Sequence, residues 1–286
     1  MIPNPMRLIA ATLALVWIMP GFSSNFPIPD PTVEQDTTRP LTLAQALDRY
    51  APSIEQAIRP RLQSAGLPYP PERLTLIALK DERLLEVWAY DQDRPRRVHS
   101  YPIKDASGLP GPKRRRGDFQ VPEGIYRINA FNPNSAYHLS LRINYPNYFD
   151  RRMGKLDGRE DLGSNIFIHG GAASRGCIAI GDPAIEELFV LVADVGLHNT
   201  KVIIAPHDPR QRSIFPIPRG LPEWTNELYH RIESAMADYP TPTESASRIA
   251  DRSEANGHAR RQFELPQDIA GEGQLTESAF TPADTH

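Results

Sequence analysis

Apolar and polar residues alternate in several short runs through the middle of this 286-residue chain. A period of two is typical of β-strands that bury one face. Three such runs follow one another between residues 73 and 103, separated by the polar turns DE and DQDRP, so we expect a β-meander there. The predicted strands cover residues 73–80, 83–90, 96–103, 135–146, 164–170, 177–180 and 200–206, with one more short strand at the end of the loop 111–128.

Before these strands, residues 41–66 repeat their apolar positions with the period of a helix. The apolar face of this predicted helix consists of Ile54, Ile58 and Leu62. Ser53 is followed by Gln56 at the capping-box spacing, and Gly66 stands where a helix would end. Because proline cannot donate to the helical ladder, we expect Pro60 to kink the helix.

A second helix is predicted after the strand at 177–180. Asp182 stands at the capping position, Pro183 occupies the first helical position and Gly196 stands at the end. The last strand, 200–206, then completes the sheet. The pattern as a whole predicts a β-rich domain with a few helices.

The N-terminus has the layout of a secretory signal peptide. Arg7 supplies a positive charge, residues 8–19 are apolar and residues 20–24 are mostly small. The apolar run is shorter than the roughly 20 residues that cross a bilayer core. We therefore expect residues 1–24 to direct export to a bacterial periplasm and to leave no stable membrane span after cleavage. A buried core helix and a retained membrane anchor are the alternatives.

Composition divides the remainder of the chain. Residues 25–40 are proline-rich and polar, which predicts a linker, and residues 41–68 form the N-terminal helical segment. A single β-rich domain is predicted at 69–207 and a helical extension at 208–238. Residues 239–286 contain more acidic than basic side chains and few large apolar ones, which predicts a disordered acidic tail.

Charge narrows the possible partners. The net charge of −3 gives no overall basic field, so nucleic acid is excluded as the main partner. The densest basic run is KRRR at residues 113–116. It is either a solvated loop tip or a contact for an anionic substrate or the cell wall.

The chemistry centres on Cys177, the only cysteine, which follows His169 by eight positions. A single cysteine excludes an internal disulfide, so a free thiol has to be explained in a protein expected to be exported. A strand, a tight loop and a returning antiparallel strand would bring the two Cβ atoms to about 4.5–5.5 Å. A neighbouring imidazole can take the proton of a thiol and make it a nucleophile. The alternative is a buried structural thiol.

The residues before the cysteine fit a nucleophile. We expect the backbone N–H groups of Gly176 and Cys177 to form an oxyanion hole, and Arg175 to add positive potential that lowers the thiol pKa. No second His or Cys lies at zinc-type spacing from Cys177. We therefore expect neither a metal nor another cofactor.

These residues resemble a known family. The stretch IHGGAASRGCIAIGD (168–182) is similar to the signature of the YkuD-type L,D-transpeptidases, in which His-Gly is followed by Ser/Thr-x-Gly-Cys. The upstream GPKRRRGDFQVPEGIYRI (111–128) resembles their Gly-Asp…Thr-Pro-Glu-Gly-x-Tyr segment. The short loop from His to Cys and the segment NPNSAYHLSLRINYPN (132–147) make the resemblance closest to the YafK branch. It covers roughly residues 69–207.

The resemblance implies a mainly β (α+β) fold, with a YkuD-like β-sandwich or mixed-sheet catalytic domain and a few short helices. It also implies a periplasmic or wall location and a cysteine that attacks a peptide bond in the peptidoglycan stem. By position, Cys177 is the nucleophile, His169 the base, and Ser174 and Gly176 the flanking residues. The residues expected to bind substrate are Arg175, Gly170, Tyr145 and Asn147.

The expected reaction is acyl transfer from diaminopimelate of a stem peptide to an amine, in cell-wall biogenesis. This chain has Arg175 where the common family pattern has histidine, and Ala179 where it has Arg or Asn. Two alternatives therefore stay open. One is an amidase of the same family that uses water to trim cross-links or to release a wall-attached lipoprotein. The other is a non-enzymatic wall-binding module.

Overall fold

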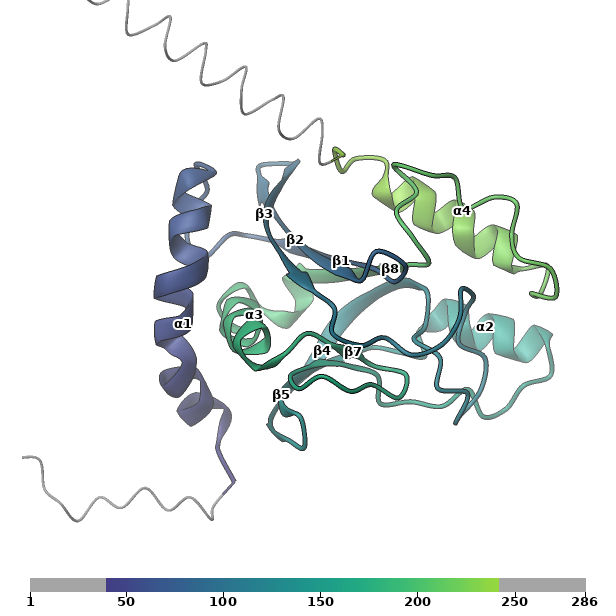
Figure 1. Cartoon of the computed structure of the whole chain (residues 1–286), viewed down its shortest axis with the longest axis horizontal. Helices are drawn as coiled ribbons and strands as arrows, with labels where there is room; N and C mark the ends of the chain where they lie inside the picture. Colours follow the sequence, from purple (N-terminus) through teal and green to yellow (C-terminus); the bar gives the residue numbers. More distant parts are fainter. Residues whose placement is uncertain (1–39, 242–286) are drawn as a thin grey trace, which may run out of the picture. The chain divides into compact units, whose positions relative to one another are not determined.

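The computed structural model describes residues 40–241, so the predicted signal peptide, residues 25–39 of the predicted linker and residues 242–286 lie outside it. Within the described range, a mixed sheet has the strand order β3-β2-β1-β8-β4-β5-β6-β7 (Figure 1). The strands are β1 (Leu74–Leu79), β2 (Leu84–Asp91), β3 (Arg94–Pro102), β4 (Gly124–Ser135), β5 (His138–Ile143), β6 (Phe167–His169), β7 (Ile178–Ala179) and β8 (Thr200–Ala205). The predicted β-meander is confirmed as β1-β2-β3. The last strand, β8, lies in the middle of the sheet, parallel to β1 and antiparallel to β4.

Helices cover both faces of the sheet. The helices of the described residues are α1 (Leu43–Ser64), α2 (Tyr148–Leu156), α3 (Asp182–Val195), the short 3-10 helix η1 (Leu197–Asn199) and α4 (Thr225–Met236). Figure 1 shows α1 and α3 on one side of the sheet and α2 and α4 on the other. Apolar side chains of α1 and α3 share one core cluster, and those of α2 and α4 share a second. Among residues 40–241, no helix is both long enough and apolar enough to cross a membrane.

The two central strands are apolar at nearly every position because both of their faces are covered. Successive residues of a strand point to opposite faces. Leu76 and Val202 accordingly belong to the α1/α3 core, whereas Ile77 and Ile203 belong to the α2/α4 core. The sheet is therefore the middle layer between two helical layers.

Strand β4 connects the two halves of the sheet. Its residues 124–127 pair with β8, and residues 128–135 pair with β5, with register shifts between Ile128 and Ala130 and between Asn132 and Ser135. Such an irregularity bends a strand and increases its twist. Strands β5, β6 and β7 then form the end of the sheet that carries Cys177 and His169. The predicted mainly β (α+β) mixed-sheet class is confirmed.

Helix α1 begins earlier than its predicted cap. The side-chain oxygen of Thr42 accepts the N–H of Gln45 at 3.2 Å, and the Gln45 side chain accepts the N–H of Thr42 at 2.9 Å, which completes a capping box. The predicted cap, Ser53 with Gln56, was wrong. Ser53 lies inside the helix and donates its hydroxyl to the carbonyl of Tyr50 at 2.6 Å. The same sequence spacing occurs twice, and the helix begins at the first.

Asp182 has a different role from the one predicted. It is the first residue of α3, and Gly181 occupies the capping position without a side-chain hydrogen bond. The Asp182 carboxylate instead accepts the backbone N–H of Gly171 at 2.7 Å. It therefore holds the loop that follows β6. The helix ends before Gly196, as predicted.

The predicted C-terminal extension is only partly helical. Helix α4 spans Thr225–Met236, and the chain between β8 and α4 contains no helix or strand. Tyr239 is buried, and its hydroxyl lies 2.9 Å from Thr75 Oγ1 and 2.6 Å from the hydroxyl of Tyr90. The predicted boundary at residue 239 therefore falls inside the packed part of the chain.

A buried charge joins the sheet to α4. The side chain of Glu123 is fully buried, and one of its carboxylate oxygens accepts from Lys80 Nζ at 2.8 Å. The same oxygen accepts the N–H of Gly111 at 2.8 Å, and the other oxygen accepts the hydroxyl of Tyr229 at 2.8 Å. One carboxylate thus fixes β1, the loop at residue 111 and α4.

We expect Glu123→Gln to lower the free energy of unfolding by about 3 kcal/mol, because the nearly buried ammonium of Lys80 would lose its counter-charge. Urea unfolding followed by circular dichroism measures this change. Asp81→Asn is the matched control, since Asp81 pairs with Arg212 where both side chains are 61% exposed, and it should cost at most about 1 kcal/mol. Equal losses in the two variants would contradict the expected role of Glu123.

Candidate active site

The site lies on one face of strands β5, β6 and β7, opposite to the α1/α3 core. The core positions of these strands and their flanks are Leu139, Leu141, Ile143, Ile166, Ile168, Ile178 and Ile180. The interleaved positions are Ser140, Arg142, Phe167, His169, Cys177 and Ala179. Because alternate residues point to opposite faces, the strand pattern places both predicted catalytic residues on the same face.

Strands β6 and β7 are parallel, so the antiparallel return predicted from the sequence was wrong. Ile168 pairs with Ile178 and His169 with Ala179. Continued by one residue, this register places Cys177 beside Phe167. His169 is then a diagonal neighbour of Cys177, with about 8 Å between the Cα atoms from strand spacing and rise. The parallel register still makes Cys177 and His169 neighbours on one face of the sheet.

His169 is 2% exposed, and its Nδ1 lies 2.6 Å from the carbonyl oxygen of Gly170. A carbonyl only accepts hydrogen bonds, so Nδ1 carries the proton and Nε2 is the acceptor. Burial lowers the pKa of His169, with smaller opposing effects from the Gly170 carbonyl and the charge of Asp105. The ring is therefore neutral at pH 7 and can act as a base through Nε2.

The acceptor atom of His169 is buried without a hydrogen-bond partner among the described residues. Ser140, which pairs with His169 across β5 and β6, has a hydroxyl that is also buried and unpartnered there. Buried polar atoms are nearly always hydrogen-bonded, and exceptions call for a water or a ligand. These two atoms mark the place where a substrate group or water would complete the site.

Cys177 is partly exposed, and its Sγ lies 3.9 Å from the carbonyl oxygen of Asn165. Burial raises the pKa of Cys177, while a hydrogen bond with the Phe167 backbone and the charge of Lys113 act in the opposite direction. The predicted lowering of this pKa was therefore wrong. No hydrogen bond joins Sγ to the His169 ring in residues 40–241, so the resting thiol is protonated and not yet engaged by its base.

Ser174 holds the backbone of the cysteine. Its Oγ donates to the carbonyl of Cys177 at 2.6 Å and accepts the Cys177 N–H at 3.0 Å. The N–H of Gly176 donates to Ser107 Oγ at 2.6 Å. Both amides predicted to form the oxyanion hole thus already have partners. Gly176 has a φ of +98°, which explains why glycine stands directly before the cysteine.

A segment after β3 that the sequence did not point to secures this loop. Asp105 accepts the N–H of Ser174 at 2.8 Å and exchanges backbone hydrogen bonds with Ala179. Asp105 and Ser107 together hold the turn that precedes Cys177. Neither residue belongs to a recognisable motif, because each contacts residues about seventy positions later in the sequence.

Gly170 is required by packing. A Cβ at this position would lie 2.5 Å from Asp182 Oδ1 and 2.7 Å from the carbonyl oxygen of Tyr137. The Tyr137 ring lies against the His169 imidazole, with 4.5 Å between the ring centroids. The sequence placed Gly170 among the substrate-binding residues, a role that stays a prediction, and did not indicate that Tyr137 covers the base.

The other predicted substrate-binding residues have different environments. Tyr145 is buried, and its hydroxyl donates to the carbonyl of Leu162 at 2.9 Å. Asn147 caps α2 and its side-chain amide donates to the carbonyl of Ile125 at 2.9 Å. These contacts favour structural roles. Arg175 is exposed, and its side chain has no hydrogen bond or ion pair in the described part of the chain. Their contact with substrate stays a prediction.

The basic run at 113–116 is not simply a solvated loop tip. Lys113 is buried and pairs with Asp118. Arg116 pairs with Asp161 at 2.8 Å on the surface. The charge of Lys113, rather than that of the predicted Arg175, is the one that opposes the raised pKa of Cys177.

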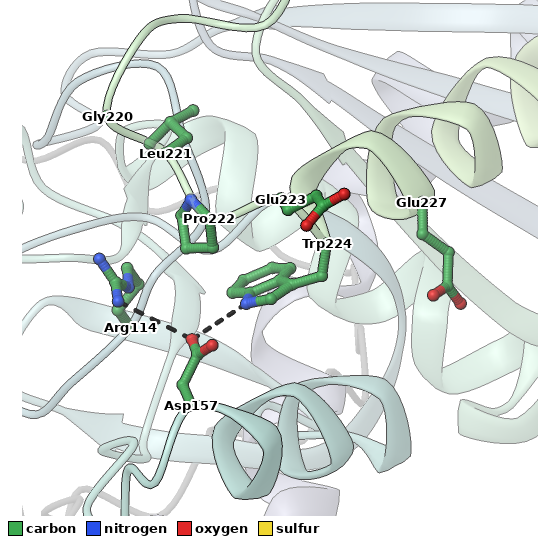
Figure 2. A pocket seen from close by; sticks show the side chains of 8 residues that line it. All are labelled: Arg114, Asp157, Gly220, Leu221, Pro222, Glu223, Trp224 and Glu227. Carbon is green, nitrogen blue, oxygen red and sulfur yellow. Dashed lines mark hydrogen bonds and ion pairs between the residues drawn. The ribbon is translucent and has the colours of Figure 1, made fainter.

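Arg114, in the same run, lines a pocket of about 640 Å³ (Figure 2). The residues around it are Arg114, Asp157, Gly220, Leu221, Pro222, Glu223, Trp224 and Glu227. Asp157 accepts from Trp224 Nε1 at 2.9 Å and lies 3.8 Å from Arg114 Nη2. This pocket therefore contains one arginine and three carboxylates, and does not favour an anionic ligand.

A second pocket, of about 380 Å³, is lined in part by Asn165, whose carbonyl oxygen lies 3.9 Å from Cys177 Sγ. It also contains Arg142, which the sequence analysis did not select. Within residues 40–241, no three His, Cys, Asp or Glu side chains are grouped as ligands of a metal ion.

The raised pKa of Cys177 gives a pH prediction. Because the thiolate is the reactive form, we expect alkylation by iodoacetamide to increase with pH through a midpoint above the ordinary value of about 8.5. Lys113→Met should move the midpoint higher, whereas Arg175→Gln should leave it unchanged. Rates measured from pH 6 to 11 by mass spectrometry decide this. A midpoint below the ordinary value, or a shift with Arg175→Gln alone, would contradict the structure.

Part of the chain is similar to known proteins. Residues 72–204 match the family model YkuD, the L,D-transpeptidase catalytic domain. The curated relative YafK of Escherichia coli K12 is 34% identical over 139 residues, which make up 48% of this chain and 51% of the relative. The chain thus spans about half the length of the curated relatives that it matches.

Two solved structures are also similar. One is a K307A mutant of the helical cell shape determining protein Pgp2 from Campylobacter jejuni, with 24% identity, 51% of this chain and 53% of that chain covered, and a TM-score of 0.41. The other is Bd1075 from Bdellovibrio bacteriovorus, with 24% identity, 48% of each chain covered and a TM-score of 0.35.

Through residues 72–204, a little under half of its length, the chain is thus similar to the YkuD family of L,D-transpeptidase catalytic domains. Within that family the similarity is to the YafK branch, as its motifs predicted.

Proposed function

We propose that the protein is a cysteine-dependent L,D-transpeptidase that acts on peptidoglycan stem peptides in cell-wall biogenesis or remodelling. The observation that carries the proposal is the buried, unpartnered Nε2 of His169 on the same face as the thiol of Cys177. The Gly170 carbonyl holds the neutral imidazole through Nδ1, which leaves Nε2 to act as the base. The match of residues 72–204 to the YkuD family model supports this reaction class.

The reaction begins when His169 Nε2 takes the thiol proton and the Cys177 thiolate attacks the carbonyl carbon on the L-centre of diaminopimelate. The bond to the terminal D-alanine breaks, and His169 gives the proton to the departing amine. A thioester joins Cys177 to the remaining tripeptide. The amine of a second stem peptide then attacks the thioester, its proton passes to His169 and on to the released thiolate, and a new peptide bond remains.

The negative oxygen formed at each attack needs a donor. The amides of Gly176 and Cys177 already bond to serine hydroxyls. The backbone N–H of Arg175 has no partner within residues 40–241, and we assign it to the oxyanion. Ser174 and Ser107 then act as positioning residues that keep this turn in place.

Hydrolysis is the second candidate. The loop between His169 and Cys177 is short, and its residues Ala172, Ala173 and Arg175 are exposed. This loop leaves the thiol partly open, and water needs only access, whereas transfer needs a groove that orients an amine. With water as acceptor, the same thioester would make the protein an amidase that trims cross-links or frees a wall-attached lipoprotein.

The two outcomes separate in one experiment. Purified protein is given a stem tetrapeptide donor, with and without an acceptor peptide that contains diaminopimelate, and the products are identified by mass. Cross-linked dimers would support transfer. Tripeptide alone, with no dimer at high acceptor concentration, would assign the protein to the hydrolases. No product from any donor would leave a wall-binding module as the better account.

The proposed location of the protein is the periplasm, where stem peptides are accessible. This location is the prediction from residues 1–24, which lie outside the described residues. N-terminal sequencing of exported protein tests it, and we expect the mature chain to begin near Ser24 or Asn25. An intact Met1 on membrane-bound material would contradict cleavage.

A further inference from the structure

The 380 Å³ pocket lined by Asn165 has a composition that points to its ligand. Its lining residues are Asn129, Arg142, Ile143, Asn144, Tyr145, Pro146, Arg151, Ser164 and Asn165. Two arginines line it together with three asparagines, and no aspartate or glutamate does. The pocket lining therefore combines two cations with neutral amide groups.

The two cations have no carboxylate paired with them among the described residues, although the charge of Arg151 acts on the neighbouring Asp150. Neither Arg142 nor Arg151 forms an ion pair within residues 40–241. Arg151 is exposed and donates to the carbonyl of Pro146. The contrast is the pocket of Figure 2, where Asp157 lies 3.8 Å from the guanidinium of Arg114. The smaller pocket is the one that lacks its own anion.

Arg142 is held in a fixed orientation. Its Nε donates to Asn129 Oδ1 at 3.0 Å, and its two terminal nitrogens have no hydrogen bond in the described part of the chain. A guanidinium can bind a carboxylate through two parallel N–H groups, a geometry that an ammonium does not offer. Arg142 thus keeps free donors for a ligand while one contact fixes its position.

The strand register places Arg142 in line with the nucleophile. Arg142 pairs with Phe167 across β5 and β6, and Phe167 lies beside Cys177 when the β6/β7 register is continued by one residue. Paired residues share a face of the sheet, so Arg142 and Cys177 are two strands apart, with about 10 Å between their Cα atoms. A long arginine side chain and a peptide bound to the thiol can meet over that distance.

We propose that Arg142, assisted by Arg151, binds a carboxylate of the peptide that acylates Cys177. The inference rests on the proposed function and names the group of the donor that the site recognises. A stem tetrapeptide carries three free carboxylates, and the third is the α-carboxylate of the γ-linked D-glutamate. The proposal concerns the two that belong to the residues on either side of the attacked bond, one on the D-centre of diaminopimelate and one on the terminal D-alanine. A stem whose recognised carboxylate is amidated would be a poor donor.

Binding to the Cys177→Ala variant tests the proposal without the reaction. Calorimetry is done with three peptides: the free tetrapeptide, the tetrapeptide amidated at the D-centre, and the tetrapeptide with terminal D-alaninamide. A hydrogen-bonded charge pair is typically worth about 10- to 100-fold in affinity. We expect amidation of the recognised carboxylate to weaken binding by that factor, and the amide that weakens binding identifies the carboxylate.

The second arm adds Arg142→Gln to the Cys177→Ala background. This variant should bind the free tetrapeptide about 10- to 100-fold more weakly, yet lose no further affinity when the recognised carboxylate is amidated. Arg94→Gln is the matched control, because Arg94 is an exposed arginine on β3, at the opposite end of the sheet. It should bind all three peptides as the parent does.

Equal binding of the three peptides to Cys177→Ala would overturn the proposal, and this arm needs no change at Arg142. So would an equal loss by Arg142→Gln for free and amidated peptides, which indicates a structural role. If Cys177→Ala distinguishes free from amidated peptides but the parent protein never forms an acyl-enzyme, the proposed function is refuted and the carboxylate site is kept. If the parent protein forms an acyl-enzyme but Cys177→Ala binds the free and amidated peptides equally, the proposed function is kept and the carboxylate site is refuted.

Discussion

We expect Cys177→Ala to abolish thioester formation and all release of D-alanine from a stem tetrapeptide. Alanine has no nucleophilic atom, and the other side chains of the site are hydrogen-bond donors, bases or cations. The variant should fold normally, because the thiol is partly exposed and has only a long contact of 3.9 Å to the Asn165 carbonyl. We expect at least a 10⁴-fold loss of D-alanine release, within the range known for removing an enzyme's nucleophile.

The rate of D-alanine release measures this loss, with circular dichroism and urea unfolding as checks on the fold. Ser174→Ala is an informative companion, since Ser174 positions the Cys177 backbone through two hydrogen bonds without reacting itself. It should retain partial activity and the ability to be acylated. Release by Cys177→Ala at more than about a hundredth of the parent rate would show that another group attacks the peptide.

His169→Ala should reduce the rate of acylation by about 10²- to 10⁴-fold, the usual contribution of a positioned general base. The loss should be largest near neutral pH, because burial raises the thiol pKa and leaves Cys177 protonated there. At high pH hydroxide can form the thiolate without help, so the defect should shrink as the pH approaches the thiol midpoint. A structural histidine would give a loss that does not depend on pH in this way.

The lowered pKa of His169 fixes the acid side of the parent profile. Since burial favours the neutral ring, activity should fall only as the pH drops below the ordinary histidine value of about 6.5. His230→Gln is the matched control, because His230 lies on α4 with a side chain that is 70% exposed. It should leave both the rate and the profile unchanged. An acid limb well above the ordinary value would contradict a buried, neutral base.

Much of the sheet could be predicted from the sequence because its strands are marked by their own residues. The meander β1-β2-β3 has polar turns between apolar runs, and the short His-Gly…Gly-Cys spacing located the site without any knowledge of the fold. The direction of β7 could not be predicted in this way. Parallel neighbours usually need a connection of a dozen or more residues. The shorter link from Gly170 to Cys177 suffices because β6 and β7 are very short strands.

The surroundings of the nucleophile were beyond the reach of local patterns. Asp105 and Ser107 approach the turn before Cys177 from a segment about seventy positions earlier. The hydroxyl of Ser107 accepts the N–H of Gly176, which we expected to bind the oxyanion. Arg142 looks like any exposed position of an alternating strand. Only the pairing of β5 with β6 and of β6 with β7 places it in line with the thiol.

Intact-mass spectrometry of the protein mixed with a stem tetrapeptide tests the central claim most directly. The predicted result is an adduct equal to the tripeptide acyl group on the parent protein, mapped to Cys177 by peptide analysis, with one D-alanine released per adduct. Cys177→Ala should show neither adduct nor release. An unmodified parent protein under conditions in which it releases D-alanine, or an adduct on any residue other than Cys177, would contradict the account.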